Sequence, residues 1–157
     1  MNITILTLGS LKEKYWIEAE AEYLKRLSPY AKVEIKELKE ESFTDKNNIE
    51  VIKEKEAQKL KNILEKKDTY IIALDSRGKQ LTSTELAKHF TELFNNQISN
   101  ITFVIGGPLG LDDSILELAD FKLSLSNLTF THQMVRTILL EQIYRSMMIL
   151  NNRSYHY

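Results

Sequence analysis

Short apolar runs alternate along this chain with longer stretches in which apolar residues recur every three or four positions. Compact apolar runs are typical of buried strands, whereas the longer spacing places apolar side chains on one face of a helix. Strands are expected at residues 3–8, 33–38, 69–74, 101–105 and 121–126, and helices at 11–27, 48–66, 82–95, 112–119 and 132–150. The polar stretch 40–48 is expected to form a loop. This alternation predicts a single α/β domain over residues 1–157, with a mostly parallel sheet flanked by helices.

The last expected helix, at 132–150, is apolar on more than one side. Met134, Ile138, Leu139, Ile143 and Met147 do not fall on a single stripe. A helix that is apolar nearly all round must be buried on two faces, which in a small domain indicates a subunit interface. The alternative is that the helix packs on the sheet and against a second helix.

Glycines gather after two of the expected strands. Gly106, Gly107 and Gly110 follow the strand at 101–105, and Gly78 follows the strand at 69–74. Ligands of open α/β sheets bind outside the carboxyl ends of the strands, where glycine lets a ligand approach the backbone. The polar stretch that follows a third strand, at 126–129, points to the same end. The alternative is that these glycines serve only tight turns.

The residues around these turns restrict the kind of ligand. The chain has neither a Gly-x-Gly-x-x-Gly motif nor a Gly-Lys-Ser/Thr loop. Asp112 and Asp113 open the next helix, where their carboxylates would repel a phosphate. An adenine nucleoside without phosphates fits better than NAD or ATP, which a Rossmann-type enzyme would bind. With no cysteine and no metal-ligand spacing among His89, His132 and His156, no metal site is expected.

Charge is unevenly distributed, although the formal net charge is only −1. Residues 122–157 hold four basic residues and one acid, which gives +3 and leaves −4 on residues 1–121. A nucleic-acid partner would therefore meet the C-terminal part or a groove shared by two subunits, unless the asymmetry is chance. The terminal Tyr155 and His156 offer a stacking ring and a titratable imidazole, as an RNA site needs, although chain ends are commonly silent. No signal peptide or membrane-spanning run is visible, and a cytoplasmic protein is expected.

Five stretches, taken in order, resemble one known family over the whole chain. They are Gly9–Lys12 with Tyr15-Trp16, Leu74–Lys79, Phe103–Gly110, Leu125–Arg136, and Glu141–Arg145 with the terminal Tyr155-His156. The chain is similar to the ribosomal large subunit methyltransferase H family of the SPOUT superfamily. The resemblance implies a trefoil knot at the C-terminal end of the domain and a homodimer. It also implies methylation of N3 of a pseudouridine, at the position usually numbered 1915, in the large-subunit ribosomal RNA of assembled ribosomes.

The same resemblance assigns the site residues. S-adenosylmethionine would be held by a set of residues from three turns: Leu74, Gly106, Gly107, Gly110, Leu125, Ser126, Asn127, Leu128, Thr129 and Phe130. The substrate side is our own hypothesis from side-chain chemistry. His156 or Tyr155 would contact the base and assist its deprotonation, and Arg136, counted as a third catalytic candidate, would hold RNA phosphate together with Arg145. His132 would order the cofactor loop.

The chain departs from the family pattern at three places. The family usually has a proline where this chain has Thr131 and a polar residue where it has Leu109. The usual ending of a small residue followed by Pro-Tyr-His is replaced by Arg153-Ser154-Tyr155-His156, and Tyr157 is last where a basic residue is common. A non-catalytic ribosome-binding factor that kept the fold is the other alternative. The intact glycine turn speaks against it.

Overall fold

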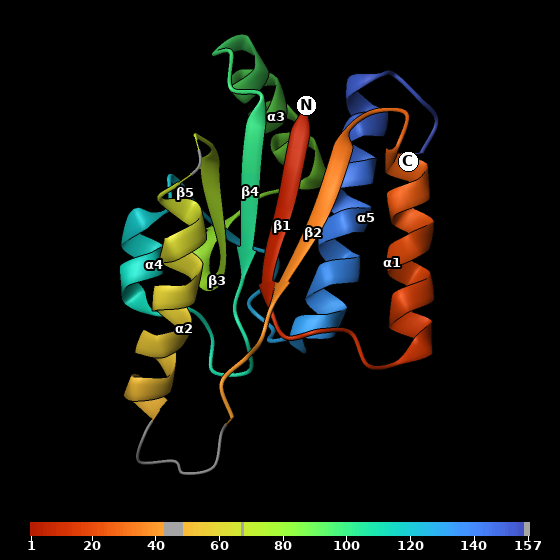
Figure 1. Ribbon diagram of the computed structural model, residues 1–157. Coiled ribbons are helices and arrows are strands. Elements are labelled where there is room, and N and C mark those ends of the chain that lie inside the picture. The colour runs from red at the N-terminus through yellow and green to blue at the C-terminus, as the bar shows by residue number, and fades with distance from the viewer. Residues whose placement is uncertain (43–48, 67, 156–157) are drawn as a thin grey trace.

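The computed structural model describes residues 1–42, 49–66 and 68–155, and within them all ten expected elements are present (Figure 1). In chain order they are β1 (Asn2–Leu8), α1 (Lys14–Leu27), β2 (Lys32–Leu38), α2 (Ile49–Leu64), β3 (Tyr70–Gln80), α3 (Ser83–Asn95), β4 (Asn100–Ile105), α4 (Asp113–Leu118), β5 (Phe121–Ser124) and α5 (His132–Leu150). The predicted α/β class is confirmed.

The five strands form one sheet in the order β2-β1-β4-β3-β5, and every neighbouring pair is parallel. Strand β2 lies at an edge, in keeping with its more polar sequence. Because the strands are parallel, the turns after β4 and β5 and the start of α5 meet at one end of the sheet, the lower end in Figure 1. This is the end at which open α/β sheets bind ligands.

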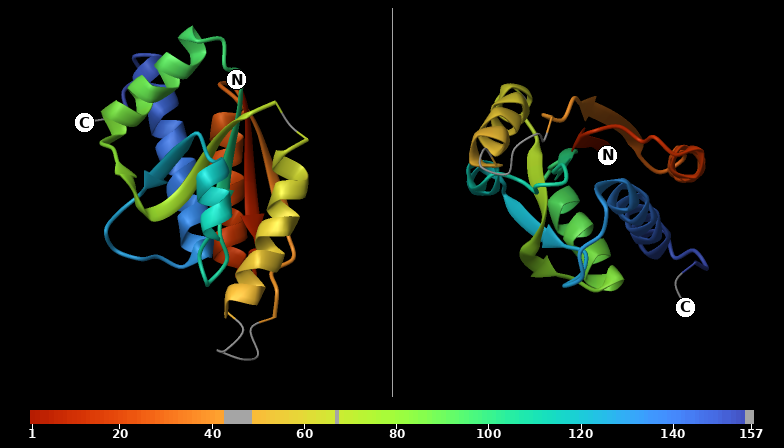
Figure 2. Two further views of the ribbon diagram at one scale, coloured as in Figure 1. Left: turned by 90° about the vertical axis from the view of Figure 1, so that its left-hand side faces the viewer. Right: turned by 90° about the horizontal axis from the view of Figure 1, so that it is seen from below.

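Helices cover both faces of the sheet, as seen from below in Figure 2. The period-two alternation of strand side chains explains this arrangement. On β1, Ile3 and Ile5 pack with α1, α3 and α5, whereas Leu6 and Leu8 pack with α2 and α4. The sheet is therefore buried on both sides, and its loops are the places left for a ligand.

Strand β3 is longer than the apolar pattern predicted. It continues to Gln80 after a register shift between Leu74 and Lys79. Gly78 lies within this extension, so the prediction that it belongs to a ligand turn is wrong. A Cβ at Gly78 would stand 2.7 Å from the backbone carbonyl of Lys122. The glycine is required because β3 and β5 approach each other closely there.

Helix α5 packs against the sheet between α1 and α3. These neighbours bury Leu139, Leu140 and Ile143 within the chain. Met134 and Ile138 remain half-buried. Packing on a sheet beside another helix, the alternative reading of this apolar helix, therefore accounts for part of its pattern but not for all of it.

Candidate cofactor site

A cavity of about 870 Å³ lies beside the middle of β3 and at the carboxyl ends of β4 and β5, and it reaches the first turn of α5. Its wall combines the glycine turn 106–111 with residues of the segment 125–135, and the middle of β3 closes it at Leu74–Ser76. Nine of the ten residues expected to hold the cofactor line this cavity, and Asn127 does not. The structure thus brings together three segments that are far apart in the sequence.

The glycine turn is shaped by contacts that exclude side chains. A Cβ at Gly106 would stand 2.8 Å from the carbonyl carbon of Gly110. Gly110 adopts a φ of +76°, and its N–H donates to the carbonyl of Gly107 at 3.0 Å. A Cβ at Gly110 would meet nothing within 4 Å, so its backbone faces open space. The turn therefore offers bare backbone to a ligand, as the glycine pattern predicted.

Hydrogen bonds made by the hydroxyl groups of its own serine and threonine residues hold the segment between β5 and α5 in shape. Ser126 Oγ accepts a hydrogen bond from the N–H of Leu128 at 3.0 Å, and Ser124 Oγ donates to the carbonyl of Ser126 at 3.0 Å. Thr131 caps α5, because its Oγ1 accepts from the N–H of Met134 at 3.4 Å. Thr131 thus begins the helix where the family has a proline, a residue that is also suited to the start of a helix.

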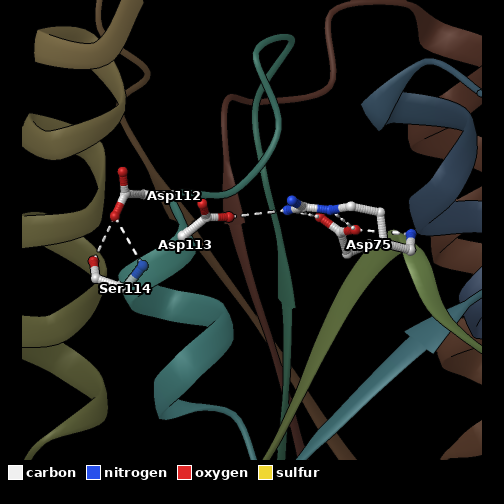
Figure 3. A network of polar contacts seen from close by, with 5 residues as sticks. Asp75, Asp112, Asp113 and Ser114 are labelled. Carbon is white, nitrogen blue, oxygen red and sulfur yellow. Dashed lines mark hydrogen bonds and ion pairs between the residues drawn. The ribbon is translucent and has the colours of Figure 1, made fainter.

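The charges around the cavity disfavour a phosphate. None of its lining residues is a lysine or an arginine. Asp75 lines it, and the side-chain hydrogen bond from Arg77 lowers the pKa of Asp75. Arg77 also donates to Asp113 at 3.1 Å, the contact drawn beside the labelled Asp75 and Asp113 in Figure 3. A phosphate would meet the carboxylate of Asp75 here, and no lysine or arginine lines the cavity to bind the phosphate.

The start of α4 is already occupied by its own cap. Asp112 Oδ1 accepts hydrogen bonds from the hydroxyl and the N–H of Ser114, at 2.6 and 3.0 Å (Figure 3). These hydrogen bonds, led by the one from the hydroxyl, lower the pKa of Asp112 and keep it ionised. A cavity with apolar walls, bare backbone and a carboxylate at its rim suits a nucleoside that has no phosphate group and bears a cationic group. The residues present therefore fit S-adenosylmethionine better than NAD or ATP.

Arg136 is placed differently from its predicted role. Its side chain is buried, and the guanidinium bonds Glu20 of α1 and Glu37 of β2, each at 2.6 Å. An arginine that is buried and paired with two carboxylates does not reach an RNA phosphate, so the prediction of a phosphate contact needs correction. Arg136 instead joins the first turns of α5 to α1 and β2.

Tyr155, one of the two candidate base-contacting residues, does not line the cavity of its own chain. Tyr155 packs against Tyr144, with ring centroids 4.8 Å apart, and Arg145 stacks on it while pairing with Glu141. Tyr144 stands roughly 18 Å along α5 from His132, which lines the cavity. Figure 1 shows the last turns of α5 near the opposite end of the sheet. His156 lies outside the described residues.

Sequence reasoning missed several acidic residues of this end of the sheet. Glu20 and Glu37 hold Arg136, and Glu56 of α2 is buried behind the glycine turn. A signal for Glu56 exists in the sequence. It occupies the inward stripe of its helix, between Ile52 and Leu60, where an apolar residue is expected.

Among the described residues, no group of three or more histidine or acidic side chains is placed to hold a metal ion. No helix in the described part of the chain is both long enough and apolar enough to cross a membrane.

Comparisons with known proteins agree with this geometry. The model of the family described as "Predicted SPOUT methyltransferase" matches residues 1–156. Ribosomal RNA large subunit methyltransferase H of Acetivibrio thermocellus is 46% identical, and the protein of the same name from Clostridium beijerinckii is 47% identical, each over 99% of both chains. A probable methylase family protein from Haemophilus influenzae shares the fold, with a TM-score of 0.59 at 14% identity over 99% of this chain and 70% of that one. The chain therefore belongs to the SPOUT methyltransferases and, among them, to the family of ribosomal RNA large subunit methyltransferase H.

Proposed function

We propose that this protein transfers a methyl group from S-adenosylmethionine to N3 of a pseudouridine, the one usually numbered 1915, in the large-subunit ribosomal RNA of assembled ribosomes. The observation that carries the proposal is the cavity beside the middle of β3 and at the carboxyl ends of β4 and β5. It joins bare glycine backbone to apolar walls and lacks any lysine or arginine. Such a cavity suits a sulfonium nucleoside and not a nucleotide.

The cofactor, when bound, supplies an electrophilic methyl group. The backbone of Gly106, Gly107 and Gly110 would approach the nucleoside, and the side chains of Leu74, Leu125 and Phe130 would cover it. Ser126 fixes the loop that carries Leu128 and Thr129 through its own hydrogen bonds. The task of these residues is to align donor and acceptor, which lowers the barrier by positioning.

The acceptor N3 carries a proton that must leave as the methyl arrives. Burial raises the pKa of the Tyr155 phenol, so Tyr155 stays protonated near neutral pH and acts as a donor or stacking partner. An unperturbed imidazole titrates near neutrality. We therefore assign proton acceptance to His156 and base contact to Tyr155.

A homodimer would bring to each cavity the base-contacting tail that the cavity lacks within its own chain. Tyr155 lies at the far end of α5 from the cavity of its own chain, so a second subunit in the opposite orientation must bring its tail to that cavity. The surface near the cavity favours such a contact, because Leu128 and Phe130 are exposed there, as are Tyr15 and Ile17 on α1. The half-buried Met134 and Ile138 add to it. Exposed apolar side chains gain from being covered, and where they form a contiguous patch they mark interfaces.

RNA binding then falls to exposed cations of the C-terminal part. Arg153 is exposed, and Arg145 keeps part of its side chain accessible although it pairs with Glu141. A shared groove between two tails would double this charge. Arg136 takes no part in phosphate binding in this account.

The decisive experiment is mass mapping of ribosomal RNA from cells with and without this gene. Loss of one methyl group at a pseudouridine, restored by the wild-type gene, supports the proposal. Intact methylation without the gene contradicts it. Calorimetry with S-adenosylhomocysteine and with NAD separates a methyltransferase from a Rossmann-type enzyme. Cofactor binding without methyl transfer to assembled ribosomes would instead identify a non-catalytic ribosome-binding factor.

A further inference from the structure

One carboxylate lies in the apolar layer between α2 and the sheet. Glu56 is only 4% exposed, and its neighbours in that layer include Ala57, Leu60 and Leu8. Among the described residues it forms no ion pair, because Lys59, on the next turn, pairs with Glu41 and donates to the carbonyl of Lys39. A leucine would fill this place without the cost of burying a carboxylate. The presence of a carboxylate here therefore needs an explanation, which its contacts provide.

The carboxylate of Glu56 lies beside two segments, one that follows β2 and one that follows β4. Its Oε1 accepts a hydrogen bond from the N–H of Glu41 at 2.9 Å, just after β2. Its two oxygens also lie 3.7 and 3.8 Å from the place where Gly107 would carry a Cβ. The glycine turn after β4 therefore passes close to this side chain, and a Cβ at Gly107 would come into contact with it.

The same turn forms a wall of the proposed cofactor cavity on its other side. Pro108 and Leu109 line both that cavity and a second one of about 750 Å³, whose wall includes Glu40, Glu41 and Glu56. The turn is thus a thin partition that has Glu56 at its back. Its own backbone bond, from Gly110 to Gly107, constrains its shape but does not anchor it to the sheet.

We propose that Glu56 is a positioning residue for the cofactor. Its carboxylate ties the segment after β2 to the back of Gly107 and so holds the glycine turn at the place where its backbone meets the nucleoside. Glu56 touches neither the cofactor nor the RNA. This inference rests on the proposed cofactor site, and the experiment below separates the two.

The test compares Glu56→Leu, Glu56→Gln and a matched control, Leu64→Ala. Leu64 is equally buried on α2, about two turns further along, and its truncation destabilises the same layer. The dissociation constant for S-adenosylhomocysteine is measured by calorimetry and the midpoint of thermal unfolding by circular dichroism. Glu56→Leu is expected to weaken binding at least about tenfold, since the N–H of Glu41 loses its acceptor and the turn its support. Glu56→Gln keeps the acceptor and is expected to stay within about threefold of wild type, and Leu64→Ala is expected to lower only the midpoint.

A second readout is the split of kinetic constants on ribosomes. Glu56→Leu is expected to raise KM for S-adenosylmethionine and to leave KM for the ribosome unchanged, a pattern that general destabilisation does not produce. If Glu56→Leu does not fold, Glu56→Asp replaces it. This variant keeps the charge but is one methylene too short, and about fivefold weaker cofactor binding is expected.

The outcomes are separable. A wild-type protein that binds no S-adenosylhomocysteine overturns the cofactor site and this inference together. Wild-type binding combined with a Glu56→Leu or Glu56→Asp variant that binds as tightly as Leu64→Ala overturns the role of Glu56 alone. A Glu56→Gln variant as weak as Glu56→Leu contradicts the role assigned to the accepted hydrogen bond.

Discussion

Arg136 of α5 and Glu20 of α1 form a buried ion pair in which Nε and Nη2 of the guanidinium both donate to one carboxylate oxygen, at 2.9 and 2.6 Å. Nη1 of the same guanidinium donates to Glu37 of β2 at 2.6 Å. Three elements are thus joined one helical turn from His132, which lines the cavity. The pair explains why an arginine stands among apolar residues on this helix.

Arg136→Ala is expected to lower the free energy of unfolding by about 3 kcal/mol, because the partly buried Glu20, whose side chain is only 15% exposed, loses its partner. Urea unfolding monitored by circular dichroism measures this change. Arg153→Ala, which removes an exposed arginine, is the control and should change stability by less than about 0.5 kcal/mol. Equal stability of the two variants would show that the buried pair contributes nothing. RNA affinity should respond in the reverse order, falling for Arg153→Ala and not for a folded Arg136→Ala.

Alanine at Gly78 and alanine at Gly110 are both expected to destabilise the fold, for different physical reasons and by different amounts. Gly78→Ala forces a Cβ to within 2.7 Å of the Lys122 backbone and should cost about 2 kcal/mol or more. Gly110→Ala meets no atom within 4 Å but must adopt a φ of +76°, which should cost about 1 kcal/mol. Urea midpoints and calorimetry with S-adenosylhomocysteine check both variants. The dissociation constant for S-adenosylhomocysteine should change for Gly110→Ala only. If Gly78→Ala weakened binding and Gly110→Ala did not, the proposed place of the ligand at the glycine turn 106–111 would be contradicted.

The position of every element could be predicted from the sequence, because hydrophobic periodicity reports which faces are buried. The ligand end followed from three glycines after β4 and the polar stretch after β5. What periodicity does not report is how closely two backbones approach. Gly78 therefore looked like a member of a ligand turn, although it serves the contact between β3 and β5. Strand β3 also ran past its apolar stretch into residues that carry no strand signal.

The charged residues of the site were harder to predict. Arg136 and Glu20 lie far apart in the chain, and a single sequence does not show that they meet. Arg136 was consequently assigned to RNA. The distance between Tyr155 and the cavity also depends on the tertiary structure, because it is set by the direction in which α5 crosses the sheet. The trefoil knot, which only the family resemblance suggested, stays a prediction.

Thr131 stands where the family has a proline, and its Oγ1 caps α5. Thr131→Val is expected to cost about 1 kcal/mol, since it removes the acceptor for the N–H of Met134. Thr131→Pro also loses the acceptor, but the φ of −62° at this position suits the proline ring and stiffens the unfolded chain. It should therefore be the less destabilised variant in urea unfolding. A proline variant less stable than the valine variant would mean that the segment 125–131 cannot accommodate the ring.

His89 of α3 gives the stability of the protein a pH dependence. Its ring stacks on Phe121 with centroids 4.7 Å apart, and its Nε2 is buried without a hydrogen-bond partner in the described structure. Burial lowers the pKa of His89 in the folded state. The unfolded chain therefore takes up the proton first, and stability falls as the pH drops below about 6.5 towards the folded-state pKa. Urea midpoints of wild type and His89→Phe between pH 5 and pH 8 should diverge at the acid end, and parallel curves would contradict the assignment.

The proposed active site combines the cavity of one subunit with the C-terminal tail of the other, and mixed dimers can test this arrangement. His156→Ala removes the proposed proton acceptor from each tail, and a bulky substitution such as Gly110→Val closes each cavity, so each homodimer should be inactive. Co-expressed with two different affinity tags and purified through both, the heterodimer would hold one intact cavity facing one intact tail. If each tail serves the cavity of its partner, as proposed, the heterodimer should regain about half of the wild-type single-turnover amplitude on ribosomes. Tyr155→Phe, which keeps the ring, serves as the mild comparison and should lose less activity than His156→Ala near neutral pH. A heterodimer as inactive as its parents, or a fully active monomer in sedimentation, would mean that each chain completes its own site.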